Sequence, residues 1–178
     1  MTQAVPRLPR SVESDPRAEL LRRWLAENAQ PLRPGGALRI ATTPLSDALA
    51  SALQRARSSG RVVRGLETAE QVLAVEEHGQ RLADRRGDGV RGARVSRLLL
   101  LTSDGADRFH RQVEALLRRH TARVLAIRVD ADADTLGALL FGAGRRARLV
   151  LLEHKEAVAE ALRALVGDGA TSGPDPMA

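Results

Sequence analysis

Apolar residues along the central and C-terminal sequence form short continuous runs that alternate with longer stretches at helical spacing. Runs such as Leu98–Leu101 are typical of buried strands, whereas apolar residues recurring every three or four positions are typical of amphipathic helices. Helices are predicted over about 45–58, 68–75, 109–117, 136–140 and 158–165, and strands over 61–64, 97–102, 124–129 and 147–152. This alternation predicts the α/β class, with a three-layer α/β/α sandwich around a mixed sheet of about four strands.

Turn residues mark the predicted boundaries. Ser59-Gly60 ends the first helix, and Ser103-Asp104-Gly105 has the side chains to cap the helix that carries Phe109. The glycine- and arginine-rich stretch 79–96 has no clear periodicity, and we expect a flexible insertion there.

The N-terminal residues predict a small extension. One face of a helix over about 16–28 is apolar, and a Pro- and Gly-rich stretch then leads to a possible strand at 37–41. We therefore expect an extension over 1–43, a core domain over 44–166 that folds alone, and a disordered tail over 167–178.

Composition narrows the functional classes. With 43% hydrophobic and 28% charged residues the chain is typical of a globular protein. Its apolar runs are too short to cross a bilayer, and its first residues do not resemble a secretory signal. The chain has no cysteine, which excludes disulfides and thiolate chemistry. We expect a cytoplasmic protein without membrane partners.

The net charge of +6 permits a polyanionic partner without requiring one. Lys155 is the only lysine among 28 basic residues, a bias that GC-rich coding also produces. The aromatic residues are Trp24, Phe109 and Phe141, too few for a platform that stacks single-stranded bases.

No catalytic or metal-binding pattern is present. The four histidines, His78, His110, His120 and His154, are scattered and predicted to lie on solvated faces. Asp130, Asp132 and Asp134 lack the glycine and glutamate of a calcium loop. We therefore expect no enzyme activity, no metal and no cofactor.

The segment from Gly60 to Thr68 is a candidate anion site. It places Arg61, Arg64 and two glycines around the start of a helix, where free amides favour a phosphate. Gly65 equally fits a simple strand-to-helix turn.

Three motifs in order resemble the kink-turn-binding ribosomal protein superfamily (L-seven-Ae-like, bacterial type). The first is Ala-Leu-x-x-Ala-Arg-x-x-Gly-Arg-Val-Val-x-Gly-x-Glu-Thr within 45–73. The second is Leu-Leu-Leu-Leu-Thr-Ser-Asp-Gly-Ala-Asp over 98–107, and the third is Thr-Leu-Gly-Ala-Leu-Leu-Phe-Gly over 135–142. The resemblance spans about residues 45–166.

This resemblance implies a non-enzymatic protein that binds structured RNA, kink-turn-like or ribosomal. A helix start would enter the groove, and a loop before Leu-Gly would cap bulged nucleotides. With Arg61 from the candidate anion site, the RNA-binding residues would be Arg61, Arg64, Gly65, Leu66, Glu67, Thr68, Glu70, Ala131, Asp132 and Ala133.

The chain departs from the family pattern in two respects. It lacks the family's Asn-Glu and following lysine at the helix start, and its capping loop is acidic. The alternative is a protein-interaction or regulatory module on the same fold that has lost RNA binding. Residues 17–37 also resemble a reduced form of bacterial YlxR-type nucleic-acid-binding proteins, without that family's paired cysteines.

Overall fold

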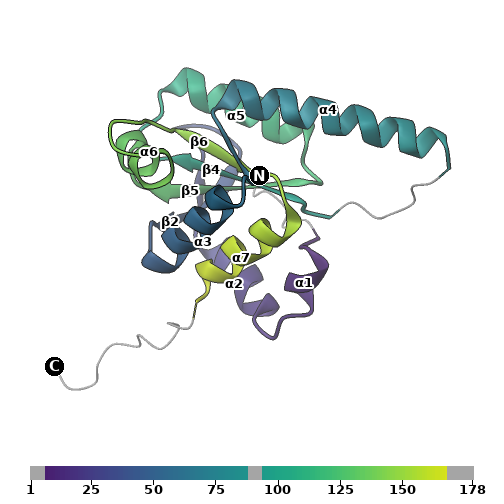
Figure 1. The fold of residues 1–178 in the computed structure, drawn as a ribbon, viewed down its shortest axis with the longest axis horizontal. Coiled ribbons are helices and arrows are strands. Elements are labelled where there is room, and N and C mark those ends of the chain that lie inside the picture. The colour runs from purple at the N-terminus through teal and green to yellow at the C-terminus, as the bar shows by residue number, and fades with distance from the viewer. Residues whose placement is uncertain (1–6, 88–93, 168–178) are drawn as a thin grey trace.

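Six strands form one mixed sheet with helices on both faces in the computed structural model, which describes residues 7–87 and 94–167 (Figure 1). The helices are α1 (Arg10–Glu13), α2 (Ala18–Glu27), α3 (Asp47–Ser58), α4 (Leu66–Arg85), α5 (Asp107–Arg119), α6 (Ala133–Phe141) and α7 (Lys155–Leu165). The strands are β1 (Ala29–Pro31), β2 (Arg39–Pro44), β3 (Val62–Arg64), β4 (Arg97–Thr102), β5 (Val124–Asp130) and β6 (Leu149–Leu152). The predicted α/β class and the element order from α3 to α7 are confirmed.

The sheet is larger than the predicted four strands. Its order is β1-β2-β5-β4-β6-β3, with β2, β5 and β4 parallel and the other neighbours antiparallel. The two additional strands come from the N-terminal segment. β2 pairs with β5, placing Ala41 opposite Ile127, and β1 adds a short antiparallel edge.

The central strand β4 has no solvated face, as its continuous apolar run predicts. All four leucines from Leu98 to Leu101 have 0% exposed surface. Leu98 and Leu100 pack in the apolar cluster with α3, α6 and α7, and Leu99 and Leu101 pack in the cluster with α4 and α5. The sheet is therefore the middle layer of a three-layer sandwich.

Helix α4 is much longer than predicted. It runs for 20 residues and includes 79–85, so the predicted flexible insertion over 79–96 is wrong for these residues. Apart from Gly79, residues 76–85 contain no strong helix breaker, and a pair between Glu77 and Arg81 at 2.7 Å supports this turn. Residues 88–93 lie outside the described part, and Val95 beyond them is buried.

The N-terminal segment packs on the same side of the sheet as α7. The guanidinium of Arg163 pairs with Asp15 at 3.1 Å, and Leu21 and Leu25 are buried in the adjoining apolar cluster. A boundary at 43/44 falls within β2, so a fragment starting there would lack most of a sheet strand. The division into extension, core and tail stays a prediction, and residues 168–178 lie outside the described part.

Within 7–87 and 94–167, no helix is both long enough and apolar enough to cross a bilayer.

Candidate nucleic-acid interface

Four helices begin at one edge of the sheet. Strands β2, β3, β4 and β5 all run in the same direction, and each is followed by a helix, α3, α4, α5 and α6 respectively. We call this edge the carboxyl edge. In α/β proteins, ligands bind beyond the carboxyl ends of such strands, where helix amino ends present free amides.

The turn into α4 requires glycine. Gly65 has φ +90° and ψ +153°, a conformation open essentially only to glycine, and its N–H donates to the carbonyl of Leu149 at 2.9 Å. No side chain caps α4, so the amides of its first turn face the carboxyl edge without a side-chain acceptor. The turn role expected of Gly65 is thus present, and an anion would find an uncapped helix start beside it.

The loop 131–133 is held rigidly against the next loop. The backbone and hydroxyl of Ser103 donate to the carbonyl of Ala131 at 3.1 and 3.2 Å, and the N–H of Ala133 donates to Asp104 at 3.1 Å. Asp132 accepts from the N–H of Thr135 at 2.7 Å and so caps α6. This backbone bond holds the pKa of Asp132 below its usual value.

Asp104 serves a different helix from the one predicted. The sequence assigned Ser103-Asp104-Gly105 to the cap of α5, but the N-cap of α5 is Ala106, without a side-chain bond. Asp104 instead joins the amino end of α6 to β4, because it also accepts from the hydroxyl of Thr102 at 2.6 Å. Burial works to raise the pKa of Asp104, but these hydrogen bonds outweigh it and the pKa is lowered.

An arginine-bearing loop lies between the two predicted contact regions. Gly65 and loop 131–133 are three strand spacings apart, about 14 Å. The segment from 142 to 148 crosses this interval with Arg145, Arg146 and Arg148 exposed. We call it the arginine loop. It is tied to both sides, because Ala147 donates to the carbonyl of Ala133 and Thr102 donates to that of Arg148, both at 2.9 Å.

A glycine of the Thr-Leu-Gly motif sets the position of the arginine loop. A Cβ atom on Gly137 would lie 2.2 Å from the carbonyl oxygen of Arg145 and 2.5 Å from the Cα of Arg146. Helix α6 therefore approaches the loop backbone more closely than any other residue would permit. Arg146 also pairs with Asp134 of α6 at 2.8 Å.

Arg64 lies at the carboxyl edge, whereas Arg61 does not. The guanidinium carbon of Arg64 lies 5.2 Å from the ring centre of Phe141, in a cation–π contact at the end of α6. Arg61 precedes β3 at its opposite end, where it pairs with Glu156 of α7 at 3.3 Å. The structure thus separates the two predicted arginines by the length of β3.

The other predicted residues are distributed over the two regions. On α4, Glu67 and Thr68 are exposed in the first turn, Leu66 packs against the core, and Glu70 lies one turn further along. Sequence reasoning missed the arginine loop. The signal was present as Arg-Arg-Ala-Arg between Gly144 and β6.

Charges of both signs occupy the carboxyl edge. Exposed carboxylates lie at or near the helix starts, and their positions are Asp47, Glu67, Asp104, Asp107, Asp130, Asp132 and Asp134. Several are engaged as caps or in ion pairs, as described above for Asp104, Asp132 and Asp134. An anionic ligand can therefore approach this edge only near the exposed arginines.

His110 is buried, contrary to the prediction of a solvated face. It is 8% exposed, and its Nε2 atom has no hydrogen-bond partner within the described residues. The side chain lies under Gly105, where a Cβ atom would be 2.8 Å from Nε2. Burial lowers the pKa of His110, and the nearby Arg128 lowers it further, against the opposing effect of Asp107.

We expect the stability of the fold to decrease as the pH falls from 8 to 5.5. The unfolded chain takes up a proton on His110 near the ordinary pKa of about 6.5, whereas the folded chain does so only at lower pH. The melting temperature should therefore drop less in His110→Gln than in the natural sequence. Some slope remains in the variant, since burial also lowers the pKa of His120. Equal slopes in the two proteins would contradict this role.

The fold and this edge define the class of protein: an α/β/α sandwich in which helix amino ends and an arginine loop meet at one edge of a mixed sheet. Neither a known protein family nor a curated protein matches the sequence. A Bacillus halodurans protein of unknown function has a similar solved structure, with 18% identity and a TM-score of 0.42 over 68% of this chain and 98% of that one. A Giardia lamblia 15.5 kD RNA-binding protein is similar with 13% identity and a TM-score of 0.44, over 68% of this chain and 88% of that one.

Proposed function

We propose that the protein is a non-enzymatic RNA-binding protein that holds structured RNA, kink-turn-like or ribosomal, at the carboxyl edge. The observation that carries the proposal is the set of exposed arginines between the uncapped start of α4 and loop 131–133. Arg64, Arg145 and Arg148 form no ion pair within the described residues, and they flank a helix start that favours anions. Each of the three motifs that resemble the kink-turn-binding superfamily contributes residues to this edge or to the position of its arginine loop, namely Gly65, Asp104 and Gly137.

Each part of the edge has a distinct role in the proposed complex. RNA phosphates contact Arg64 and the first amides of α4, and the arginine loop continues this row toward α6. Loop 131–133 contacts nucleotides through its backbone, because Asp132 is engaged as a helix cap. Recognition rests on the shape and backbone of the RNA, since the sequence has only three aromatic side chains for base stacking.

The carboxylates of the same edge favour the second candidate, a protein-interaction or regulatory module. A phosphate close to Asp130 would be repelled, and a basic peptide would be attracted. The two candidates differ in salt dependence. Phosphate contacts release counterions, so RNA binding through them weakens steeply with salt. A protein-interaction module would not bind RNA even at low salt.

Replacing Arg64 by Gln should weaken RNA binding more than replacing Arg61 by Gln. The two side chains carry the same charge and are three residues apart, but only Arg64 lies at the carboxyl edge. In filter binding to a kink-turn RNA, Arg64→Gln should flatten the plot of log affinity against log salt by roughly 0.7–0.9 per lost phosphate contact. Arg61→Gln is the matched control and should leave the slope nearly unchanged.

The same series tests the function itself. The natural sequence should bind the kink-turn RNA at low salt more tightly than an unrelated hairpin. If it binds neither RNA, the RNA-binding proposal is wrong and the protein-interaction module takes its place. If Arg61→Gln and Arg64→Gln weaken binding equally, RNA does not dock at the carboxyl edge.

A further inference from the structure

The last turns of α4 extend beyond the sheet. Figure 1 shows this helix continuing past the ends of the strands, and residues 81–87 are all exposed. These turns carry Arg81, Arg85 and Arg86. Because α4 has 20 residues, its two ends are about 30 Å apart, so these arginines lie far from the carboxyl edge.

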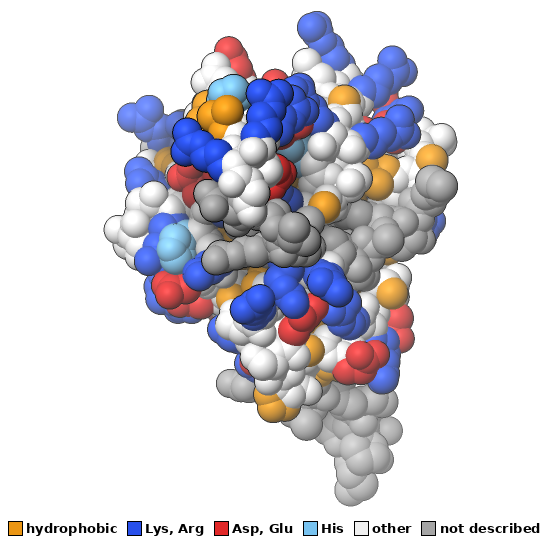
Figure 2. Space-filling model, turned by 90° about the vertical axis from the view of Figure 1, so that its right-hand side faces the viewer, with side chains coloured by type: hydrophobic (Ala, Val, Ile, Leu, Met, Phe, Trp, Pro, Cys, Tyr) orange, Lys and Arg blue, Asp and Glu red, His pale blue; other side chains and the backbone are white. Residues whose placement is uncertain are grey.

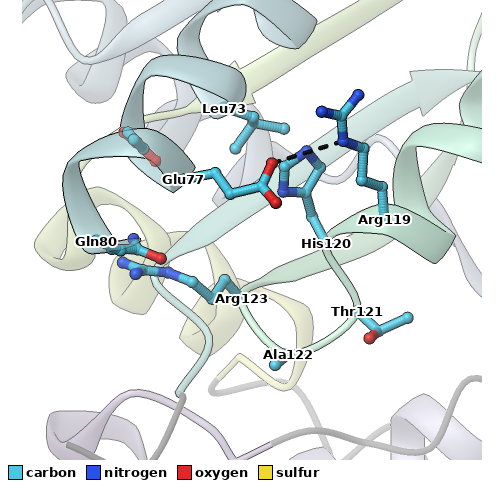
Figure 3. Close-up of a pocket in the computed structure, with 9 residues that line it drawn as sticks. Leu73, Glu77, Gln80, Arg119, His120, Thr121, Ala122 and Arg123 are labelled. Carbon is cyan, nitrogen blue, oxygen red and sulfur yellow. Dashed lines mark ion pairs between the residues drawn. The ribbon is translucent and has the colours of Figure 1, made fainter. Parts of the chain in front are cut away.

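A polar hollow separates α4 from the turn between α5 and β5 (Figure 3). Its volume is about 160 Å³. Helix α4 contributes the carboxylates of Glu76 and Glu77, and the facing turn contributes Arg119, His120 and Arg123. In Figure 3 the Glu77 carboxylate points toward Arg119, beside the ring of His120. The hollow is thus lined by opposed charges from two elements.

Two glutamates and two arginines line the hollow itself, and the excess of positive charge comes from arginines beside it. Glu77 is shared by Arg81 at 2.7 Å and Arg119 at 3.5 Å, so one carboxylate faces two guanidinium groups. Arg123 donates to the hydroxyl of Ser96 at 3.2 Å and forms no ion pair within the described residues.

The excess of positive charge beside the hollow is large relative to the net charge of the whole chain. The charged residues on or beside the hollow and the end of α4 are Arg81, Arg85, Arg86, Arg97, Arg119 and Arg123, with Glu76, Glu77 and Asp84. They leave a formal charge of +3, half of the net +6 of the protein. Figure 2 shows arginine side chains gathered on the face that includes this end of the molecule. The carboxyl edge, by contrast, balances its arginines with carboxylates.

Burial lowers the pKa of two basic side chains in the hollow. Burial lowers the pKa of His120, with Glu77 acting in the opposite direction and Arg119 reinforcing the decrease. Burial likewise lowers the pKa of Arg123, and Arg97 adds to the effect while Glu76 opposes it. For both side chains the loss of hydration outweighs the nearby carboxylate, so an anion in the hollow would stabilise the positive forms.

We propose that Arg81, Arg85, Arg86, Arg119 and Arg123 form a second RNA-contacting surface, with one phosphate seated beside Arg123. We call it the α4–α5 basic surface, and the inference rests on the proposed function. The bound RNA then carries a helical arm that extends about 30 Å from the carboxyl edge along α4. Arginine without aromatic partners suits contact with the backbone of a duplex arm rather than with unpaired bases.

The test uses the full chain and a kink-turn RNA in two forms, one with a long helical arm and one with that arm shortened to a few base pairs. The double variant Arg85→Gln/Arg86→Gln should reduce affinity for the long form by roughly tenfold at 0.1 M salt and flatten its salt slope by about 1.5. Affinity for the short form should barely change. The matched control Arg10→Gln/Arg23→Gln removes two exposed charges from α1 and α2 and should affect neither form.

A separate measurement tests whether a phosphate occupies the hollow. NMR titration of the His120 ring should show a raised pKa in the complex with the long form. Arg123→Gln should abolish this rise, and its melting temperature confirms that the variant is folded.

If the natural sequence binds the RNA but the Arg85/Arg86 variant loses no more affinity than the control, the α4–α5 basic surface is not an RNA contact and the carboxyl-edge proposal stands. An unchanged His120 pKa in the complex would show that no phosphate binds in the hollow. Absence of binding to either RNA form would overturn the proposed function and this inference with it.

Discussion

Leu100→Asp should leave no cooperatively folded protein at 25 °C. Leu100 is completely buried in β4, between β5 and β6 and beneath α7, so its replacement would place a carboxylate in the core without a partner. Such a change costs several kcal/mol, comparable with the total stability of about 5–15 kcal/mol of a domain this size. Soluble yield and circular dichroism during heating measure the effect.

The control for this prediction is Leu20→Asp. Leu20 is 37% exposed on α2, and a carboxylate there remains hydrated. The control should therefore melt within a few degrees of the natural sequence. A Leu100→Asp protein with the same melting temperature would show that β4 is not the buried central strand.

Gly137→Ala should both destabilise the fold and weaken RNA binding. The added Cβ would meet the backbone of Arg145 and Arg146 at distances that real Cβ atoms essentially never show, and backbone cannot rotate away as a side chain can. We expect a loss of about 1–3 kcal/mol in the free energy of unfolding. Because the arginine loop must shift, filter binding should also show reduced affinity for the kink-turn RNA.

Gly79→Ala, the same substitution within helix α4, is the matched control. Within the described residues, no atom beyond its chain neighbours and the nearby backbone of α4 lies within 4 Å of a Cβ built on Gly79, and its φ is not positive. Alanine there should raise the free energy of unfolding by up to about 1 kcal/mol, because it restricts the unfolded chain and favours the helix. If both variants were equally stable, the close approach between α6 and the arginine loop would not exist.

The sequence predicted correctly those elements that have a clear local pattern of apolar residues. The four leucines of β4 form an uninterrupted apolar run, and their interpretation as a central strand is confirmed. The α3 to α7 order follows from the alternation of short apolar runs with helical spacing. These features depend on neighbouring residues, which a sequence displays directly.

Features that depend on distant partners were missed. The possible strand at 37–41 corresponds to β2, but its pairing with β5, more than eighty residues away, was not predicted. Asp104 accepts from the first N–H of α6 instead of capping the adjacent α5, and His110 is covered by Gly105. In each case the deciding contact is absent from the local sequence.

The candidate site was predicted in part for the same reason. The start of α4 and loop 131–133 carry local motifs, and both lie at the carboxyl edge. Arg61 was placed with Arg64 because they are neighbours in sequence, yet β3 carries them to opposite ends. The arginine loop reaches the edge only through its bonds to Ala133 and Thr102.

The pairing of β4 also has a consequence for how the protein is made. Both neighbours of this strand, β5 and β6, lie downstream in the chain, the latter ending at Leu152. During synthesis, β4 therefore emerges from the ribosome with two unpaired edges. Strand β5 can pair with one edge once residue 130 has emerged, but the other edge stays unpaired until β6 has followed. Such a segment is prone to pair with other nascent chains. We therefore expect ribosome-bound intermediates that end before residue 152 to depend on chaperones for solubility, with release from that dependence once β6 has emerged.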